Sequence, residues 1–338
     1  MLNTLKNTAR QPSDKVADIL VDQPGQFENE APSSLGVVSP IAAAEDKNLL
    51  QKEVEACESL GETRDHKKIF LYRYHENSVL MNEIGRLREA SFRLIGEGTG
   101  HARDLDLYDR YYMHIVLWDE VDLEVVGAYR LCSANDINAQ SRKELYTASL
   151  FKFLPNAKAF LDSGLELGRS FVQEKYWGSR SLEYLWFGIS AFLRRNPQYR
   201  YLFGAVSISN TLSVQAKDVL VRYYQRYYGA KEGYVECKLP YQIDMESEAR
   251  IDELFGQASA KDAFILLKKQ LRYLGFTIPV LYKQYAELSK PGGTQFLAFN
   301  VDPDFNDCID GLVVVDIEQM SDLKRKRYGL LNHKTSKN

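Results

Sequence analysis

The 338-residue chain has few cysteines, no long apolar run and no large excess of charge of either sign. Its four cysteines lie far apart without a Cys-x-x-Cys pair, which favours reduced thiols over disulfide bridges or a zinc site. No window approaches the roughly 20 apolar residues that span a bilayer, and the N-terminus has no apolar signal-peptide core. A formal charge of −3 argues against a dedicated nucleic-acid binder. We therefore expect a cytoplasmic protein without a metal site and without a nucleic-acid partner.

Aromatic residues are plentiful instead, and the N-terminal part differs in composition from the rest. The 21 Tyr, 16 Phe and 3 Trp can build a large apolar interior or line a long pocket. Residues 1–64 carry a formal charge of −5, whereas the remainder carries about +2. We expect residues 1–64 to form an acidic, largely disordered tail with a short helix near Ala42–Ser59. The folded domain is expected at 65–338, including a C-terminal extension at 235–338.

Beyond residue 67, apolar periodicities alternate between strand and helix. Strands are predicted at 69–74, 112–118, 124–132, 165–172, 201–208, 296–300 and 311–317. Helices are predicted around 81–92, 182–193, 212–228 and 262–274. The third strand is apolar on both faces, which is typical of a sheet covered on both sides. The pattern predicts an α/β fold, with a mixed central sheet flanked by helices on both faces and an α+β extension.

Several charged residues occupy positions that the periodicity assigns to the interior. Arg88 lies on the buried ridge of its helix, and Arg130 shares a strand face with apolar residues. Buried charges must be paired, because an unpaired one costs several kcal/mol. The sequence therefore predicts a polar cluster inside an aromatic shell. Its members are Arg88, Asp106, Asp109, Arg130, Glu166 and Arg169.

Glu166 and Arg169 interrupt one apolar strand, and in a regular strand they would point to opposite faces because their spacing is odd. A β-bulge at Gly168 would turn both toward one side, and bulges are frequent next to active sites. A structural ion-pair network explains the same pattern equally well from the spacing alone.

Four segments, taken in order, resemble one branch of the GNAT superfamily. They are Arg86–Arg93, Asp104–Asp109, Gly127–Leu131 and Leu165–Val172. The branch contains the acyl-homoserine-lactone (autoinducer) synthases and the ornithine- and glycine-lipid N-acyltransferases, which are loosely called hemolysin-like proteins. The similarity extends roughly over residues 67–320. The autoinducer-synthase pattern falls, in order, on Arg88/Phe92, Asp106/Asp109, Arg130 and Glu166/Arg169.

The resemblance implies a GNAT-like fold and an amide-forming acyltransferase. Such an enzyme moves a long-chain, 3-hydroxy fatty acyl group from acyl carrier protein, or from coenzyme A, to the amine of an amino acid or a similar small molecule in lipid biosynthesis. Acyl-phosphopantetheine or acyl-CoA would be a co-substrate, and no tightly bound cofactor is expected. The product would be amphiphilic, so we expect peripheral contact with the inner membrane. Two alternatives stay open: an autoinducer-type signal synthase, and a non-catalytic GNAT-like module that binds acyl carrier protein.

The resemblance and the chemistry of thioester aminolysis assign roles within the cluster. Glu166, Arg169 and Arg130 are the candidate catalytic residues, with Glu166 as general base. Aromatic surroundings would raise the pKa of Glu166, whereas the arginines would lower it. Backbone N–H groups freed by the bulge would hold the oxyanion, and the glycine-rich loop 96–100 would act as a lid. The expected acceptor-binding residues are Arg88, Phe92, Asp106 and Asp109.

A separate segment is expected to bind the acyl donor. The GNAT pyrophosphate signature, Gln/Arg-x-x-Gly-x-Gly/Ala, is half present in Lys175–Arg180, which weakens acetyl-CoA as donor and is compatible with a carrier protein. The helix that begins here would direct N–H groups toward a phosphate, although a plain Ser-capped helix fits equally well. The donor-binding residues predicted are Lys175, Gly178, Ser179 and Arg180. An acidic carrier protein would dock on nearby basic residues: Arg194, Arg195, Arg200, Lys217, Arg222 and Arg226.

Overall fold

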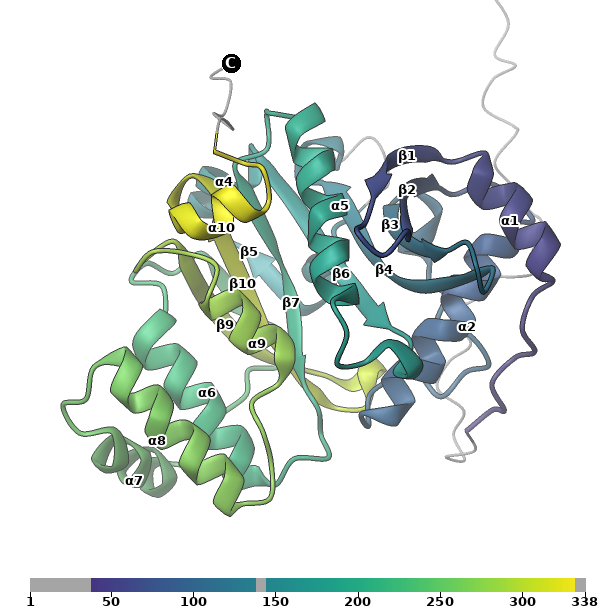
Figure 1. The fold of residues 1–338 in the computed structure, drawn as a ribbon. Helices are drawn as coiled ribbons and strands as arrows, with labels where there is room; N and C mark the ends of the chain where they lie inside the picture. Colours follow the sequence, from purple (N-terminus) through teal and green to yellow (C-terminus); the bar gives the residue numbers. More distant parts are fainter. Residues whose placement is uncertain (1–37, 138–143, 332–338) are drawn as a thin grey trace, which may run out of the picture.

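The computed structural model describes residues 38–137 and 144–331, and an eight-stranded sheet forms the centre of this part of the chain (Figure 1). Its strand order is β1-β2-β3-β4-β6-β7-β10-β9, and neighbouring strands are antiparallel except for the parallel pair β6 and β7. A second, two-stranded sheet pairs β5 with β8. The strands are β1 (Glu58–Glu62), β2 (Lys68–Arg73), β3 (Met113–Asp119), β4 (Glu124–Ser133), β5 (Phe151–Phe153), β6 (Gly164–Val172), β7 (Tyr201–Ile208), β8 (Val235–Cys237), β9 (Thr294–Asp302) and β10 (Cys308–Asp316).

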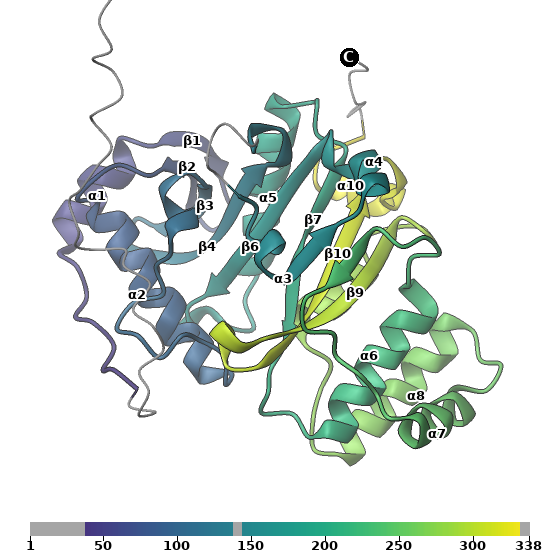
Figure 2. The ribbon, with the colours of Figure 1, turned by 180° about the vertical axis from the view of Figure 1, so that it is seen from behind.

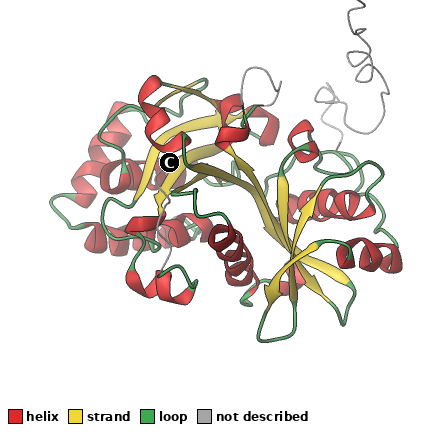
Figure 3. Cartoon of the chain, turned by 90° about the horizontal axis from the view of Figure 1, so that it is seen from above, coloured by secondary structure: helices red, strands yellow, loops and turns green. Residues whose placement is uncertain are grey.

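Helices lie on both sides of the strands when the molecule is seen from above (Figure 3). The sheet is covered on both faces, which confirms the predicted α/β architecture. In the described part of the chain, no helix combines the length and the apolar character that crossing a membrane needs. The helices are α1 (Lys47–Glu55), α2 (Val79–Leu94), α3 (Thr147–Leu150), α4 (Lys158–Leu161), α5 (Ser181–Arg195), α6 (Val214–Tyr228), α7 (Met245–Phe255), α8 (Ala260–Tyr273), α9 (Val280–Ala286) and α10 (Asp322–Arg327).

Two helices, α5 and α2, cover opposite faces of the N-terminal half of the sheet (Figures 1 and 2). Strand β2 shows this arrangement residue by residue, because successive side chains of a strand point to opposite faces. Ile69 and Leu71 pack in the core with α5, whereas Phe70 and Tyr72 pack in the core with α1 and α2. Helices α6, α8 and α9 join the core of α5 over the C-terminal half of the sheet.

The sheet opens between β6 and β7. Their parallel pairing covers only Gly164–Glu166 and Tyr201–Phe203, although both strands continue beyond these residues. At Gly204 a Cβ would lie 2.0 Å from the carbonyl oxygen of Leu167, so the two backbones are still in close contact there. One step further, a Cβ added at Gly168 would meet no atom within 4 Å. Open space therefore begins beside Gly168.

The β9–β10 hairpin bridges this opening to helix α2, as Figure 2 shows at its tip. A short 3-10 helix, Pro303–Phe305, forms the tip. The Phe305 ring meets Phe92 of α2 edge-on at 5.2 Å, and Asn306 donates a hydrogen bond to the carbonyl of Gly96. Residues far apart in the sequence thus close around one region of the sheet.

The N-terminal boundary differs from the expectation. The helix expected near Ala42–Ser59 is present as α1, but β1 follows it and pairs with β2 at the edge of the main sheet. The folded part of the chain therefore begins upstream of residue 65, because pairing with β2 recruits a segment too polar to be read as a strand. The rest of the predicted tail, residues 1–37, lies outside the described residues.

Candidate active site

Arg88 and Asp109 form the buried base of the predicted cluster. Helix α2 carries Arg88 inward and begins at Ser78, whose hydroxyl accepts a hydrogen bond from the N–H of Met81. Two guanidinium nitrogens of Arg88 donate to the two carboxylate oxygens of Asp109, each at 2.8 Å. The Arg88 Nε also lies 3.2 Å from the Asp104 carboxylate. Such a two-pronged pair fixes the orientation of both side chains.

Arg130 of β4 binds the same acidic segment from the sheet. Its Nη1 donates to Asp106 at 2.6 Å and to Asp109 at 3.1 Å. Asp106 and Asp109 also form a reciprocal capping box at the N-terminus of the 3-10 helix Leu107–Arg110, which holds their carboxylates in place. The Nε and Nη2 of Arg130 are buried without a hydrogen-bond partner. Its guanidinium instead faces three aromatic rings, at 5.5, 5.0 and 5.5 Å: Tyr108, Tyr112 and Tyr146.

A β-bulge in β6 places Glu166 and Arg169 on the same side, as the sequence predicts. In the pairing with β4, Gly168 faces Arg130 and Phe171 faces Ala128, so two residues of β6 oppose a single residue of β4. Arg169 has a φ of +46°, a left-handed conformation that is rare outside glycine. Both side chains of interest consequently reach Tyr146: Glu166 accepts its N–H, and the Arg169 guanidinium lies 4.9 Å from its ring.

Glu166 is surrounded by hydrogen-bond donors. Its carboxylate accepts from the Tyr112 hydroxyl, from the N–H of Tyr146 at 3.1 Å and from the N–H of Thr147 at 2.7 Å. Burial raises its pKa, although the donors and Arg130 oppose that effect. Of the two influences that the sequence leaves open, burial is therefore the stronger. These contacts fasten residues 146–147 to strand β6.

Arg169 connects the cluster to the hairpin tip. Its Nε lies 3.3 Å from the Asp104 carboxylate, and its Nη2 lies 3.9 Å from Asp106. The opposite side of the guanidinium faces Phe305 at 4.5 Å. Phe92 packs against this Phe305 ring, at 5.2 Å. All six charged residues predicted from the sequence thus meet in one buried cluster.

Ion pairing with the arginines governs the pKa of Asp109, at the base of this cluster. Burial by itself would raise the pKa of Asp109, but Arg88 and Arg130 outweigh it and hold that pKa well below its usual range. Burial lowers the pKa of His114 more than its contact with Asp109 raises it. His114 is therefore a neutral core histidine that supports Asp109 at 3.2 Å.

The sequence reasoning missed a second polar group on the far side of Arg169. Asp302 ends β9 and Asp310 lies in β10, and Glu97 follows helix α2. The Tyr146 hydroxyl donates to Asp302 at 2.8 Å, and the Ser207 hydroxyl donates to Asp310 at 2.6 Å. The only available signal was the acidic run 302–310, which reads as a turn.

The glycine-rich loop 96–100 is held in place by several hydrogen bonds, contrary to its interpretation as a lid. Thr99 donates through both its N–H and its hydroxyl to the buried carboxylate of Glu89, and the N–H of Gly100 donates to the same carboxylate. Asn306 binds the carbonyl of Gly96. These contacts fasten the loop that carries Glu97 to α2 and to the tip of the hairpin.

The predicted donor-binding residues lie on the exposed surface before α5, apart from the cluster. Lys175 forms ion pairs with Asp122 at 3.1 Å and with Glu124. Gly178 has a φ of +74°, which permits the turn into the helix. The Ser179 hydroxyl donates to the carbonyl of Tyr176, and Arg180 pairs with Glu183 at 2.8 Å.

The basic residues predicted to receive a carrier protein all have partners within the chain. Arg194 donates to the carbonyl of Tyr328, and Lys217 donates to Asn210. The other four are in ion pairs: Arg195 with Glu58, Arg200 with Asp316, Arg222 with Asp252 and Glu248, and Arg226 with Asp252. Their positive charge is therefore largely compensated locally.

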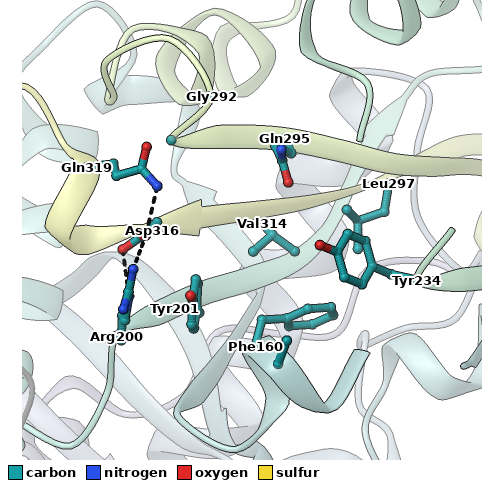
Figure 4. A pocket seen from close by; sticks show the side chains of 12 residues that line it. Phe160, Arg200, Tyr201, Tyr234, Gly292, Gln295, Leu297, Val314, Asp316 and Gln319 are labelled. Carbon is teal, nitrogen blue, oxygen red and sulfur yellow. Dashed lines mark hydrogen bonds and ion pairs between the residues drawn. The ribbon is translucent and has the colours of Figure 1, made fainter. Parts of the chain in front are cut away.

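A pocket at the other end of the sheet contains none of the predicted site residues except Arg200 (Figure 4). Arg200 and Gln319 both bind the Asp316 carboxylate at one end of it. The rest of the wall is mostly apolar and includes Phe160, Tyr201, Tyr234, Leu297 and Val314.

Known proteins match the segment of the chain that carries this cluster. Residues 87–187, which include Arg88, Asp106, Asp109, Arg130, Glu166 and Arg169, match the acetyltransferase (GNAT) domain family. The match identifies a GNAT domain within the chain, and together with the names of the relatives it supports an acyltransferase. The chain is 29% identical over 306 residues to a glycine N(alpha)-acyltransferase of Phocaeicola vulgatus, covering 86% of this chain and 92% of that protein.

Two more curated proteins are similar to this chain. A glycine N(alpha)-acyltransferase of Bacteroides thetaiotaomicron is 27% identical, with 86% of this chain and 89% of that protein covered. An L-ornithine N(alpha)-acyltransferase of Brucella abortus is 32% identical over 40% of this chain and 58% of that protein. Among solved structures, the acyl-homoserine-lactone synthase LasI matches 47% of this chain and 78% of its own, with 16% identity and a TM-score of 0.30. A structural similarity at that level carries no argument about mechanism.

Proposed function

We propose that the protein transfers a long-chain fatty acyl group, 3-hydroxylated as in lipid-forming acyltransferases, from a thioester to the α-amine of an amino acid, with glycine as the first candidate. The similarity to two glycine N(alpha)-acyltransferases over about nine-tenths of their length supports this acceptor. The product would be a membrane lipid precursor, made by a cytoplasmic enzyme in peripheral contact with the inner membrane.

The observation that carries the proposal is the bulge of β6 at the edge of the opening between β6 and β7. Forming an amide from a thioester requires a positioned carbonyl, stabilisation of the developing oxyanion and an unprotonated amine. The bulge places Arg169 beside the free space at Gly168, where a thioester arm has room to enter. The breaks in pairing around residues 168–170 leave backbone N–H groups suited to hold the oxyanion.

Within this proposal the charged residues divide into two roles. Arg130 and Arg169 retain N–H groups without hydrogen-bond partners and are suited to bind a carboxylate of the acceptor. Arg88 and Asp106 each bind Asp109, and the two aspartates hold Arg130 in position. Glu166 holds residues 146–147 against β6, and its three donors favour a positioning role over that of a free base.

The donor in this proposal is acyl carrier protein or acyl-CoA. The start of α5, with Lys175, Gly178, Ser179 and Arg180 exposed, is the surface that would meet the phosphopantetheine or its phosphates. Most of the arginines of α5 and α6 already form ion pairs within the chain. They are therefore less available to an acidic partner than the sequence predicts.

The test is incubation of the full chain with long-chain and 3-hydroxy acyl-CoA, and with the same acyl groups on carrier protein, against single amino acids. Products are identified by mass spectrometry. An N-acyl glycine or other N-acyl amino acid is the expected result. A lactone would show an autoinducer-type synthase, and no amide with any pair would overturn the proposed function. Comparing lipid extracts of cells with and without the gene would identify the product formed in the cell.

A further inference from the structure

The β9–β10 hairpin brings two carboxyl groups together at the opening of the sheet. Asp310 lies opposite Ser207 of β7 in the ladder and accepts its hydroxyl hydrogen bond. Asp302, on the neighbouring strand, accepts from Tyr146. Both aspartates are buried, with 1% and 3% of their surfaces exposed. They also interact directly with each other, and that contact raises the pKa of Asp310.

The groups around Asp310 come from several elements and include two further carboxyls. They are Asp302 of β9, Arg169 of β6, Ser207 of β7, Tyr146 before α3, Tyr282 of α9, Cys308 of β10 and Glu97 after α2. Arg169 is the only guanidinium among these neighbours, and it is shared with Asp104. Burial, together with Asp302, raises the pKa of Asp310 to about 7. Burial, together with Asp310, raises that of Glu97 to about 8.

Unused donors lie next to these acids. The Nε atoms of Arg130 and Arg169 and the Nη2 of Arg130 are buried without a hydrogen-bond partner, and Arg130 is 1% exposed. Both guanidiniums lie over the ring of Tyr146, the residue whose hydroxyl binds Asp302. On one side of Tyr146 the region has N–H groups that can bind a carboxylate. On the other side it has carboxyl groups that can bind a cation. Among the described residues, no group of acids is arranged to hold a metal ion.

We propose that Asp310, supported by Asp302 and Glu97, binds the α-ammonium group of the acceptor amino acid and takes its proton. This inference rests on the proposed function and names the group that makes the amine nucleophilic. The ammonium gives one proton to the Asp310 carboxylate, and the free amine attacks the thioester carbonyl. The C–N bond forms and the C–S bond breaks, and the second nitrogen proton goes to the leaving thiolate. Asp310 then releases its proton to solvent.

This assignment differs from the role that the sequence gave to Glu166. Glu166 accepts three hydrogen bonds from groups of the protein itself, two of which are backbone N–H groups that cannot turn away. For Asp310, the Ser207 hydroxyl is the one hydrogen-bond donor found among the described residues, and a hydroxyl can rotate. A carboxyl that titrates near neutral pH also matches the requirement for a base that accepts a proton at physiological pH.

The test compares the wild type with Asp310→Asn and, as a matched control on the same strand, Asp316→Asn. The acylation rate with glycine is measured from pH 5 to 9. The wild-type kcat/KM should rise through an apparent pKa near that of Asp310, about 7. Asp310→Asn should lose about 100-fold in kcat/KM, the usual contribution of a general base, and should lose that pH limb. Asp316→Asn should retain both. Equal rates and equal profiles in wild type and Asp310→Asn would overturn the inference.

A binding measurement separates this inference from the proposed function. Calorimetry is carried out with glycine and with glycolate, in which a hydroxyl replaces the ammonium group. Asp310→Asn should weaken glycine binding at least tenfold and leave glycolate binding unchanged. If wild type forms no amide but shows this pattern, the proposed function fails and the ammonium site stands. If glycine binds equally well to wild type and Asp310→Asn, or binds to neither, the ammonium site is wrong.

Discussion

The hydroxyl of Tyr146 donates a hydrogen bond to the carboxylate of Asp302 at 2.8 Å. The backbone N–H of the same tyrosine binds Glu166, and its ring faces the guanidiniums of Arg130 and Arg169. Tyr146 is therefore the residue that joins the acidic group on the hairpin to the charged cluster on the other half of the sheet. Its position directly links two parts of the site that the sequence does not connect.

Replacing Tyr146 by Phe should affect the pH profile more than the fold. The ring and the backbone contact to Glu166 remain, and one hydrogen bond to a buried carboxylate is lost, which costs about 1–3 kcal/mol of unfolding free energy. Without that donor the carboxyl pair holds its proton more tightly, so the acidic limb of kcat/KM should move to higher pH. Urea unfolding and a pH–rate profile measure the two effects. An unchanged limb with reduced stability would mean that Tyr146 serves the fold alone.

Arg88 should be indispensable for stability. Its removal leaves the buried Asp109 with Arg130, His114 and the N–H of Asp106 as partners, and breaking a buried ion pair in this way costs about 3–5 kcal/mol. Arg88→Met should therefore lower the urea midpoint strongly. Lys152→Ala removes an exposed ion pair with Glu236 and should change the unfolding free energy by less than about 1 kcal/mol. Similar midpoints for the two variants would contradict the buried role of Arg88.

The sequence predicted the cluster that contains Arg88, Arg130 and Arg169 because charged residues stand out in a pattern of buried apolar positions. Buried arginines need acidic partners, which indicated Asp106 and Asp109. The bulge followed from the odd spacing of Glu166 and Arg169. Asp302 and Asp310 escaped because strand ends that face a polar site lack the apolar alternation by which strands are recognised. Their partners come from distant segments. The register of β10 on β7 brings Ser207 to Asp310, and Tyr146 reaches Asp302 from the segment before α3.

Asp310→Asn should stabilise the protein at alkaline pH. The pKa of Asp310 is raised in the folded state to about 7, so the folded state binds this proton more tightly than the unfolded chain. Stability that depends on this proton is present at acidic pH and is lost as the pH rises toward and through about 7. The melting temperature of the variant should therefore exceed that of wild type at pH 8, with a smaller difference at pH 5. Lower stability at pH 8 would show that the ionised carboxylate is well compensated.

Two glycines on either side of the opening should respond differently to an added methyl group. A Cβ at Gly204 would lie 2.0 Å from the carbonyl oxygen of Leu167, so Gly204→Ala should force β7 away from β6 and lower the melting temperature. A Cβ at Gly168 meets no atom within 4 Å. Gly168→Ala should therefore fold normally and raise the KM for the acyl donor, because the methyl group occupies space that the thioester needs. A normal donor KM in a folded Gly168→Ala protein would place the donor elsewhere.

Glu166→Gln distinguishes a base from a residue that holds the site together. An amide presents one carbonyl oxygen and one NH₂ group to three donors, so at least one contact is lost and residues 146–147 loosen against β6. We expect a strong fall in kcat, a modest loss of stability and an acidic limb that still lies near pH 7, since Asp310 is untouched. If the limb disappears instead, Glu166 is the group that titrates. The Asp310→Asn profile, measured under the same conditions, then decides between the two carboxyls. The variant that abolishes the acidic limb, while the other variant keeps it, identifies the carboxyl that takes the proton.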